Sequence, residues 1–217
     1  MTQSTASWLS HPAVPYVAPF AVFLLLTELA RWVPGSQLWM YPVKTVLAAL
    51  LLFYFWRTYD EITLKFSQLA LMVGVIAFVL WIPLYGGFLL LSKPEVVNPY
   101  DLAGQWAIPW IIVRLLGSTL VVSVMEELFW RSFLLRYLIN PDFRQVPIGT
   151  FTWASLDISV ALFGAEHNQW FAGIVAGLLY TLLLYRTTSL FDCIVAHAVT
   201  NFLLGLYVLW FQQWQYW

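Results

Sequence analysis

Charge is scarce in this 217-residue sequence. Charged residues make up 10% of it, whereas a typical soluble domain carries roughly 25%. The formal net charge is -1 and no block of basic residues occurs, which argues against nucleic acid or another polyanion as a partner. A single cysteine, Cys193, excludes an internal disulfide.

Apolar residues dominate instead, at 61% of the chain, with a mean hydropathy of +0.76. The apolar runs are long and lack the alternation of membrane-spanning strands, so we expect helices that cross a lipid bilayer. The predicted fold is an all-α, polytopic transmembrane bundle without a soluble domain. We expect about seven spans, with eight as the alternative, at about 14–31, 42–56, 66–85, 108–137, 150–166, 169–186 and 189–211.

The segment 91–106 is too polar to cross the membrane, and its Trp and Tyr residues suit a position flat on the interface. The predicted loops place more basic residues on one side, which we therefore expect to be cytoplasmic. These are Arg57, Lys65, Arg136, Arg144 and Arg186, against Arg31, Lys44 and Lys93 on the other side. The lack of soluble domains favours a multi-pass protein of a bacterial plasma membrane.

Three charged residues interrupt the fourth apolar run: Glu126, Glu127 and Arg131. Each such charge at the middle of a span costs roughly 2.5 to 3.5 kcal/mol on insertion scales, so it indicates a function. Glu127 and Arg131 are four residues apart and can pair on one helical face. Glu126 lies about 100° around the helix and stays available as a base. The alternative is that all three charges only hold helices together.

Two further polar clusters follow in the sequence. His167 lies at the junction of the fifth and sixth spans, where an ordinary loop histidine is an equal alternative. His197 and Asn201 share a face of the seventh span, where their alternative role is a hydrogen bond between helices. Glu126 and His197 lie at similar depth, roughly 15 Å from one membrane side. His167 matches that depth only if the fifth helix starts late or breaks near Gly164.

A third feature of these spans is the motif Gly173-x-x-x-Gly177, which is typical of close packing between helices. We interpret it as structural.

Together, Glu126-Glu127-x-x-x-Arg131, Phe163-x-x-x-His167 and His197-x-x-x-Asn201 resemble the three motifs of the CAAX-protease and bacteriocin-processing membrane family. This family is also called Abi and includes the type II CAAX prenyl endopeptidases. The resemblance covers roughly 111–211. It implies a single transmembrane domain over 1–217, with N-terminal spans of unassigned role in 14–107 and a core with the catalytic motifs in 108–211.

The resemblance also implies an intramembrane endopeptidase and a role for each motif. Glu126 with His167 would activate a water molecule, and His197 with Asn201 would stabilise the oxyanion. Glu127 and Arg131 would support the site. The implied partners are the lipid bilayer and a peptide or protein substrate, which lipid modification could tether to the membrane. No cofactor is implied.

Three rival interpretations stay open at this point. One is a metalloprotease, with zinc on Glu126, His167 and His197. The sequence contains no HExxH, and the inverted HxxEH pattern fails because Phe163 stands at its first histidine. Another is a cysteine mechanism with Cys193 and His197, although a thiol in apolar surroundings is a poor nucleophile. The third is a non-catalytic immunity or scaffold protein, or a small transporter.

Overall fold

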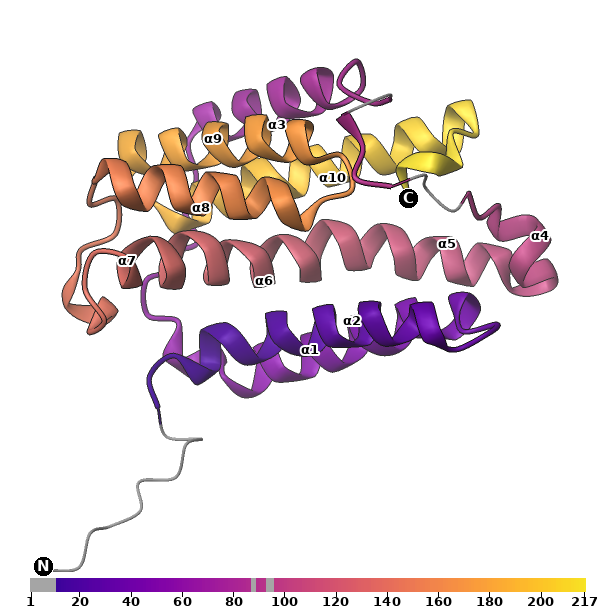
Figure 1. The fold of residues 1–217 in the computed structure, drawn as a ribbon, viewed down its shortest axis with the longest axis horizontal. Coiled ribbons are helices and arrows are strands. Elements are labelled where there is room, and N and C mark those ends of the chain that lie inside the picture. Colours follow the sequence, from indigo (N-terminus) through magenta and orange to yellow (C-terminus); the bar gives the residue numbers. More distant parts are fainter. Residues whose placement is uncertain (1–10, 87–88, 93–95) are drawn as a thin grey trace, which may run out of the picture.

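A computed structural model describes residues 11–86, 89–92 and 96–217, and the regular structure in them is helical. The part of the chain that it describes forms seven helical rods, which confirms the predicted number (Figure 1). Six are single helices: α1 (Val14–Trp32), α2 (Gln37–Tyr54), α3 (Gln68–Trp81), α8 (Trp153–Glu166), α9 (Trp170–Thr187) and α10 (Leu190–Phe211).

The remaining rod, the fourth along the chain, is built from several pieces. After the short helix α4 (Pro99–Ala103) and a 3-10 turn, η4 (Gly104–Trp106), it continues through five contiguous segments. These are α5 (Ala107–Leu116), the π-helical η5 (Gly117–Val122), α6 (Ser123–Glu127), the π-helical η6 (Leu128–Leu134) and α7 (Leu135–Tyr137). We call α5 to α7 the central helix.

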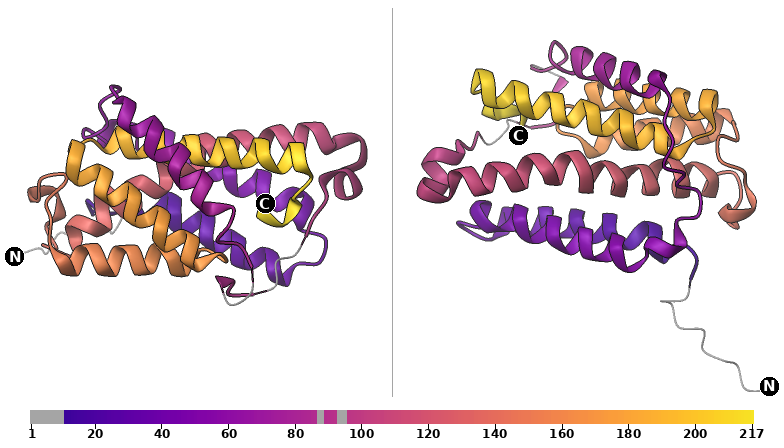
Figure 2. Two further views of the ribbon diagram at one scale, coloured as in Figure 1. Left: turned by 90° about the horizontal axis from the view of Figure 1, so that it is seen from above. Right: turned by 180° about the vertical axis from the view of Figure 1, so that it is seen from behind.

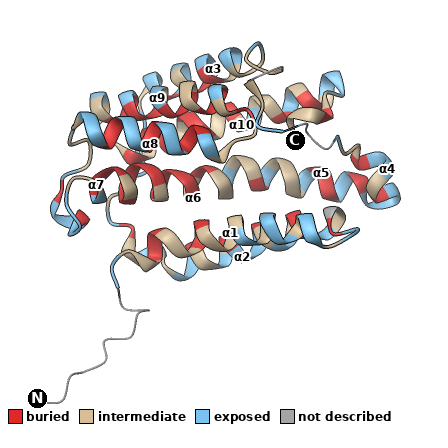
Figure 3. Cartoon of the chain, viewed as in Figure 1, coloured by how far each residue is buried: buried red, intermediate tan, exposed pale blue. Residues whose placement is uncertain are grey.

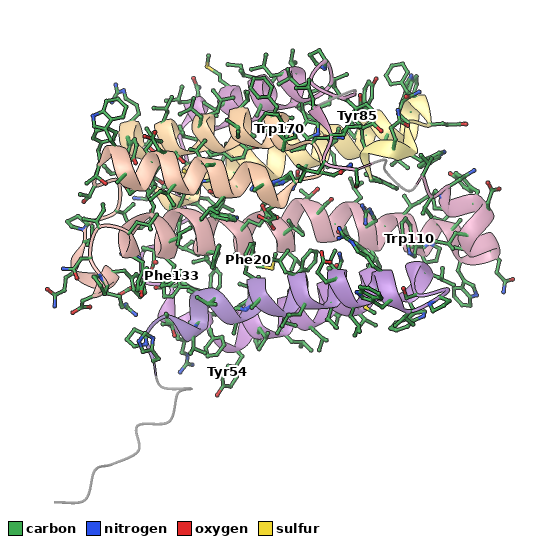
Figure 4. The ribbon with its side chains drawn as sticks, in the orientation of Figure 1. Phe20, Tyr54, Tyr85, Trp110, Phe133 and Trp170 are labelled. Atoms are coloured by element: carbon green, nitrogen blue, oxygen red, sulfur yellow. The ribbon has the colours of Figure 1, made fainter. Side chains whose placement is uncertain are left out.

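The central helix lies between two groups of helices (Figures 1 and 2). The α1–α2 hairpin packs on one side, and α8, α9, α10 and α3 pack on the other, with α3 against α10 and α8 against α9. Burial is concentrated along α6 and η6, where the two groups meet (Figure 3). Phe20 and Phe133 fill the space between the central helix and α1, whereas Tyr54 points away from the bundle (Figure 4).

The outer faces of the helices are apolar. Leu25, Phe53 and Trp210 are 69%, 83% and 82% exposed, which only a lipid environment makes favourable. Four rods are long and apolar enough to cross a membrane: α1, the rod from Pro99 to Tyr137, α9 and α10. The helices α2 and α3 are equally apolar but shorter. The chain is therefore an integral membrane protein.

The fifth rod is shorter than the sequence indicates. The apolar run suggests a helix over 150–166, but α8 begins only at Trp153, where Thr152 caps it by accepting a hydrogen bond from the Ser155 amide (3.1 Å). Its 14 residues span about 21 Å, less than a hydrocarbon core of about 30 Å. The turn from α8 to α9 consequently lies partway along the central helix (Figure 1). His167 is the residue that ends α8 at this depth.

The polar segment before the central helix is only partly described, because Lys93, Pro94 and Glu95 of the expected interfacial stretch lie outside the described residues. Asn98 caps α4 by accepting from the Tyr100 amide (3.1 Å), and Gly104, at φ +52°, breaks the rod between α4 and α5. This break places the start of the central helix at Ala107, next to the predicted residue 108.

The loop after α2 and the loop after the central helix meet at one end of the bundle. Arg144 pairs with Asp60 (2.9 Å), and Arg136 pairs with Glu61 (3.2 Å). The structure thus brings Arg136 and Arg144 to the same end, as the alternation of predicted loops requires. Lys44 differs from the expectation: it is not a loop residue but lies within α2, facing the interior. The side predicted to be opposite the cytoplasm also included Arg31 and Lys93. Lys93 lies outside the described residues.

The Gly173–Gly177 motif packs α9 against α8, as expected. A Cβ atom on Gly173 would lie 3.0 Å from the Gly164 Cα, and one on Gly177 would lie 2.9 Å from the Phe163 ring. Gly74 allows a similar approach of α3 to α10, since its Cβ would meet the Ala196 carbonyl oxygen at 2.5 Å and the Val199 Cβ at 2.8 Å.

We expect Gly74→Ala to destabilise the fold by about 1 to 3 kcal/mol, because the added methyl group forces α3 away from the α10 backbone. Thermal unfolding of the purified protein in detergent measures this loss. The control is Val75→Ala, at the next residue, which is 44% exposed. Equal melting temperatures for the two variants would contradict the packing described here.

Candidate active site

The central helix departs from α-helical geometry on both sides of Glu126 and Glu127. The π-helical segments η5 and η6 precede and follow the single regular turn α6, which carries the two glutamates. A π-helical turn leaves backbone carbonyl groups free for other partners and often accompanies a functional site. Here the Ser118 carbonyl oxygen accepts a hydrogen bond from Asn201 Nδ2 of α10 (2.9 Å).

Glu127 and Arg131 form the predicted ion pair. The Arg131 guanidinium lies 3.2 Å from Glu127 Oε1, and both side chains are almost fully buried. Arg131 also donates to the Gly177 carbonyl oxygen of α9 (3.1 Å) and lies 4.3 Å from the centroid of the Phe163 ring. These contacts join the central helix to α8 and α9. Removing one member of such a buried pair typically costs about 3 to 5 kcal/mol.

His197 shares the carboxylate of Glu127, a contact that the sequence did not predict. Its Nδ1 donates to Glu127 Oε1 at 2.8 Å, and its ring stacks on Tyr180 with centroids 5.1 Å apart. Tyr180 in turn donates to Thr200 Oγ1 (2.7 Å). Glu127 therefore holds Arg131 and His197 together and fixes the orientation of the imidazole, so that Nε2 points away from Glu127.

Glu126 is buried but is not held in this way. Its Oε2 has no hydrogen-bond partner among the described residues and lies 3.9 Å from His197 Nε2. The two neighbouring glutamates thus have different surroundings: Glu127 is tied to two cationic or proton-donating groups, and Glu126 faces open space. This is the division that their helical positions predicted.

His167 directly follows the last residue of α8, Glu166, and reaches the same region. Its Nδ1 donates to the Phe163 carbonyl oxygen at 2.7 Å, and its ring packs edge-on against Trp81 of α3 at 5.5 Å. With Nδ1 carrying the hydrogen, the neutral ring has its acceptor at Nε2. Of the two alternatives that would let His167 match the depth of Glu126, the structure shows the late start: α8 begins at Trp153 and is unbroken at Gly164.

Asn201 lies one helical turn beyond His197 on α10. Its Nδ2 donates to the Ser118 carbonyl oxygen (2.9 Å) and, more weakly, to Ser123 Oγ (3.4 Å). The amide is therefore oriented by η5 and α6. The sequence analysis did not identify Ser118 and Ser123 as partners of Asn201. Their contacts depend on the π-helical turn η5, which no sequence pattern predicts.

These four residues line one cavity of about 250 Å³ inside the bundle. Glu126 comes from the central helix, His167 from the end of α8, and His197 and Asn201 from α10. Aromatic side chains form much of the wall, among them Phe23, Tyr41, Trp81, Phe163 and Tyr180. A larger groove of about 1230 Å³ lies between α1, the central helix and α8, and shares Trp81 and His167 with the cavity.

The zinc alternative would use Glu126, His167 and His197 as ligands. Across residues 11–86, 89–92 and 96–217, no three His, Cys, Asp or Glu side chains are grouped as metal ligands. We derive no step through a metal.

Two other residues weighed from the sequence lie apart from this centre. Cys193 is fully buried, its Sγ donates to the Tyr180 carbonyl oxygen (3.3 Å), and it is not among the residues that line the cavity. Glu166 accepts from Trp130 Nε1 (3.1 Å) and lines the larger groove.

A comparison with protein families supports the resemblance that the three motifs indicated. The model of the family described as type II CAAX prenyl endopeptidase Rce1-like matches residues 108–203, a little under half of the chain. This stretch contains all six residues singled out above, from Glu126 to Asn201. No curated protein and no solved structure matches the chain.

The different surroundings of the two glutamates predict different effects on stability. We expect Glu127→Gln to destabilise the protein by about 3 to 5 kcal/mol, because Arg131 loses its carboxylate partner inside the bundle. Glu126→Gln should cost far less, since it removes a buried carboxylate oxygen that has no partner. Thermal unfolding in detergent compares the two isosteric variants. The assignment is wrong if Glu126→Gln is the more damaging change.

Proposed function

We propose that the chain is an intramembrane endopeptidase, on the premise that residues 108–203 match the model of the type II CAAX prenyl endopeptidase Rce1-like family. It would hydrolyse a bond of a peptide or protein substrate in the cavity beside Glu126. The observation that carries the proposal is the Glu126 Oε2 atom, which has no hydrogen-bond partner among the described residues and shares the cavity with two histidines, one of them bonded to the buried Glu127.

In the proposed reaction Glu126 acts as the general base. A water molecule in the cavity gives a proton to the Glu126 carboxylate while its oxygen attacks the peptide carbonyl carbon. The resulting tetrahedral intermediate collapses with cleavage of the C–N bond, and Glu126 returns the proton to the departing amine. His167 would help to position the water, because its Nε2 is the ring atom left to accept a hydrogen bond from it.

His197 is the proposed donor to the oxyanion. Its Nδ1 hydrogen bonds to Glu127. When Nε2 also carries a proton, the imidazole is a cation, and the Glu127 carboxylate stabilises its charge. That N–H then points into the cavity toward the developing negative charge. Donors of this kind are typically worth about 3 to 4 kcal/mol. Asn201 would add a second donor by exchanging its weaker bond, the one to Ser123 Oγ, for the oxyanion.

The substrate is proposed to be an extended peptide segment that enters from the lipid-facing groove. The groove and the cavity share the walls formed by Trp81, Arg114 and His167, so one opens toward the other. The family's name refers to prenylated substrates of the proteins that it describes. For this chain we propose that the substrate is a membrane-associated peptide, with or without an attached lipid. The rival functions, a scaffold or immunity protein or a transporter, require no cleaved product.

We expect Glu126→Gln to lower the rate of peptide release by about a hundredfold or more, because a general base contributes about 10² to 10⁴ in rate. The assay incubates the purified protein in liposomes with membrane proteins from its own cell and identifies the cut sites by mass spectrometry. Undiminished cleavage by Glu126→Gln would reject the proposed role of Glu126. Absence of cut sites with the wild-type protein would favour a non-catalytic function.

Two further variants serve as controls in this assay. Asp157→Asn changes an exposed carboxylate on α8 and should cleave like the wild-type protein. Cys193→Ala should also retain activity, since this thiol donates to the Tyr180 backbone and does not line the cavity. Loss of cleavage in Cys193→Ala would instead support the cysteine mechanism. Loss of activity with a chelator, restored by zinc, would support the metal alternative.

We also propose a bacterial plasma membrane as the location, with the end that carries Arg136 and Arg144 in the cytoplasm. A single cysteine introduced at Arg144 should then be protected from an impermeant thiol reagent in intact cells, whereas one at Asp101 should be labelled. Cys193 gives no background because it is fully buried. The reverse labelling pattern would invert the orientation.

A further inference from the structure

The turn between α8 and α9 places in the larger groove a carboxylate that the proposed reaction does not use. Glu166, the last residue of α8, lines this groove together with Gln169, which directly precedes α9. His167 lies between them in the chain and also lines the cavity beside Glu126. The two residues are therefore next to the proposed reacting centre, on the side from which the substrate would enter.

The segment before α4 holds this turn in position. Ser92 donates to Asn168 Oδ1 through both its amide and its hydroxyl group, each at 2.9 Å, and Asn168 Nδ2 donates to the Ser92 carbonyl oxygen (3.1 Å). The Leu91 amide donates to the Asn168 carbonyl oxygen at 2.8 Å. These bonds fix the wall of the groove, which lowers the cost of ordering it around a ligand.

No cation of the protein neutralises Glu166. Trp130 Nε1 donates to its Oε2 (3.1 Å), and among the described residues no basic side chain forms an ion pair with it. Glu28, the other carboxylate of the groove lining, is paired with Arg31 (3.0 Å). Arg114 lines the groove as well, but its guanidinium lies over an aromatic ring, 4.2 Å from the centroid. Glu166 thus has a hydrogen-bond donor but no counter-charge.

Gln169 adds a second acceptor without a donor. Its side chain is buried, and its Oε1 has no hydrogen-bond partner among the described residues. A buried oxygen left unpaired costs free energy, which a ligand with N–H groups would recover. Glu166 Oε1 is also available, because a carboxylate accepts at both oxygens and Trp130 uses Oε2. The groove therefore offers two oxygen acceptors, one of them on a carboxylate.

This pair of acceptors favours a cationic nitrogen as the ligand. A lysine ammonium group has three N–H donors and an arginine guanidinium has five, whereas a backbone amide of a peptide supplies one. A carboxylate also gains more from a cation than from a neutral donor, because charge-assisted hydrogen bonds are roughly twice as strong as neutral ones. Ionisable residues inside membrane-spanning bundles commonly mark the path of a substrate.

We propose that Glu166 and Gln169 bind a basic side chain of the substrate, so that the enzyme cuts close to a Lys or Arg residue. This inference rests on the proposed peptidase function. Because neighbouring Cα atoms are about 3.8 Å apart, a cation bound at Glu166 belongs to a residue within about three positions of a bond that reacts beside His167. The substrate class is a membrane-associated peptide with a basic residue near the cleaved bond.

Binding to the Glu126→Gln variant tests the site without requiring cleavage. The probes are apolar dodecapeptides with a fluorescent, blocked N-terminus, identical except that one scanned position carries Lys, norleucine or Glu. Fluorescence anisotropy in a neutral detergent should show the Lys peptides binding at least about tenfold tighter than the norleucine peptides at the best position. The blocked N-terminus excludes an α-amino group as the bound cation. Equal binding of the Lys and norleucine peptides at every position, or no binding, overturns the inference.

Substitution of Glu166 should change this preference according to charge. In the Glu126→Gln background, Glu166→Gln should abolish the preference for Lys, although glutamine can still accept the hydrogen bond from Trp130. Glu166→Lys should reverse it, so that the Glu peptides bind best. Gln169→Leu should reduce it about threefold, because it removes the uncharged acceptor.

The matched control is Glu28→Gln, which removes the exposed and paired carboxylate of the same groove and should keep the preference for Lys. A preference that survives Glu166→Gln, or that Glu28→Gln abolishes equally, contradicts the assignment. Because the peptides are compared on the same protein, a variant with partly reduced folding still yields a valid ratio.

Kinetics with the wild-type protein separate this inference from the peptidase proposal. Replacing the basic residue by norleucine should raise KM about tenfold with little change in kcat, because the contact with the cation is made equally in the ground and transition states. If the variant prefers Lys peptides but the wild-type protein cuts none of the probes, the peptidase function fails and the cation site stands. If Lys and norleucine peptides are cut equally well, the cation site fails and the peptidase function stands.

Discussion

The Glu127 carboxylate is the group on which the arrangement of the site depends. It binds Arg131 at 3.2 Å on its own helix and His197 at 2.8 Å on α10, and Arg131 continues to the Gly177 carbonyl oxygen of α9. Three helices are thus joined at one buried charge. In an apolar bundle the hydrophobic effect does not favour one helix arrangement over another, because lipid is as apolar as the helix surface. Polar contacts of this kind therefore determine which faces meet.

The same network separates the functions of two adjacent glutamates. A carboxylate with two partners is fixed in position, which suits a supporting group. A carboxylate that has no partner and faces a cavity is free to exchange a proton, which suits a general base. The irregular geometry of the central helix contributes to this separation, because the π-helical segments on either side of α6 supply a carbonyl acceptor for Asn201 and place Arg131 beside Phe163.

The position of His167 illustrates what a linear pattern leaves open. The apolar run from 150 onward predicts a continuous span, and a straight helix from Thr150 would carry His167 nearly to the far side of the membrane. The structure starts α8 three residues later, at Trp153, and ends it at the predicted residue, Glu166, with the turn to α9 partway along the central helix (Figure 1). Close packing of Gly173 and Gly177 against α8 stabilises this short hairpin. The turn depends on contacts between the two helices, which no hydropathy window includes.

Lys44 and Arg114 show the complementary case. The rule that drew attention to Glu126, that a charge inside an apolar run indicates a function, applies to both of them from the sequence alone. The predicted span of 42–56 puts Lys44 in the first helical turn, beside the loop, whereas α2 begins at Gln37 and places Lys44 about two turns inside the helix. A shift of five residues in one helix boundary decides whether this cation faces water or the interior.

The sequence by itself determined that this chain is a membrane protein, that its regular structure is helical, and how many rods it has. It also determined which polar residues cost enough free energy within an apolar span to indicate a function. These properties follow from local composition and from the transfer energies of single residues. Only the tertiary structure decided that Glu126, His167, His197 and Asn201 share one cavity, that Glu127 serves both Arg131 and His197, and that two basic residues, Lys44 and Arg114, line the same cavity. Those facts depend on helix lengths, on π-helical turns and on packing between helices that are distant in the sequence. The hydrophobic periodicity of a single helix does not contain this information, because it reflects only residues that are close together in the chain.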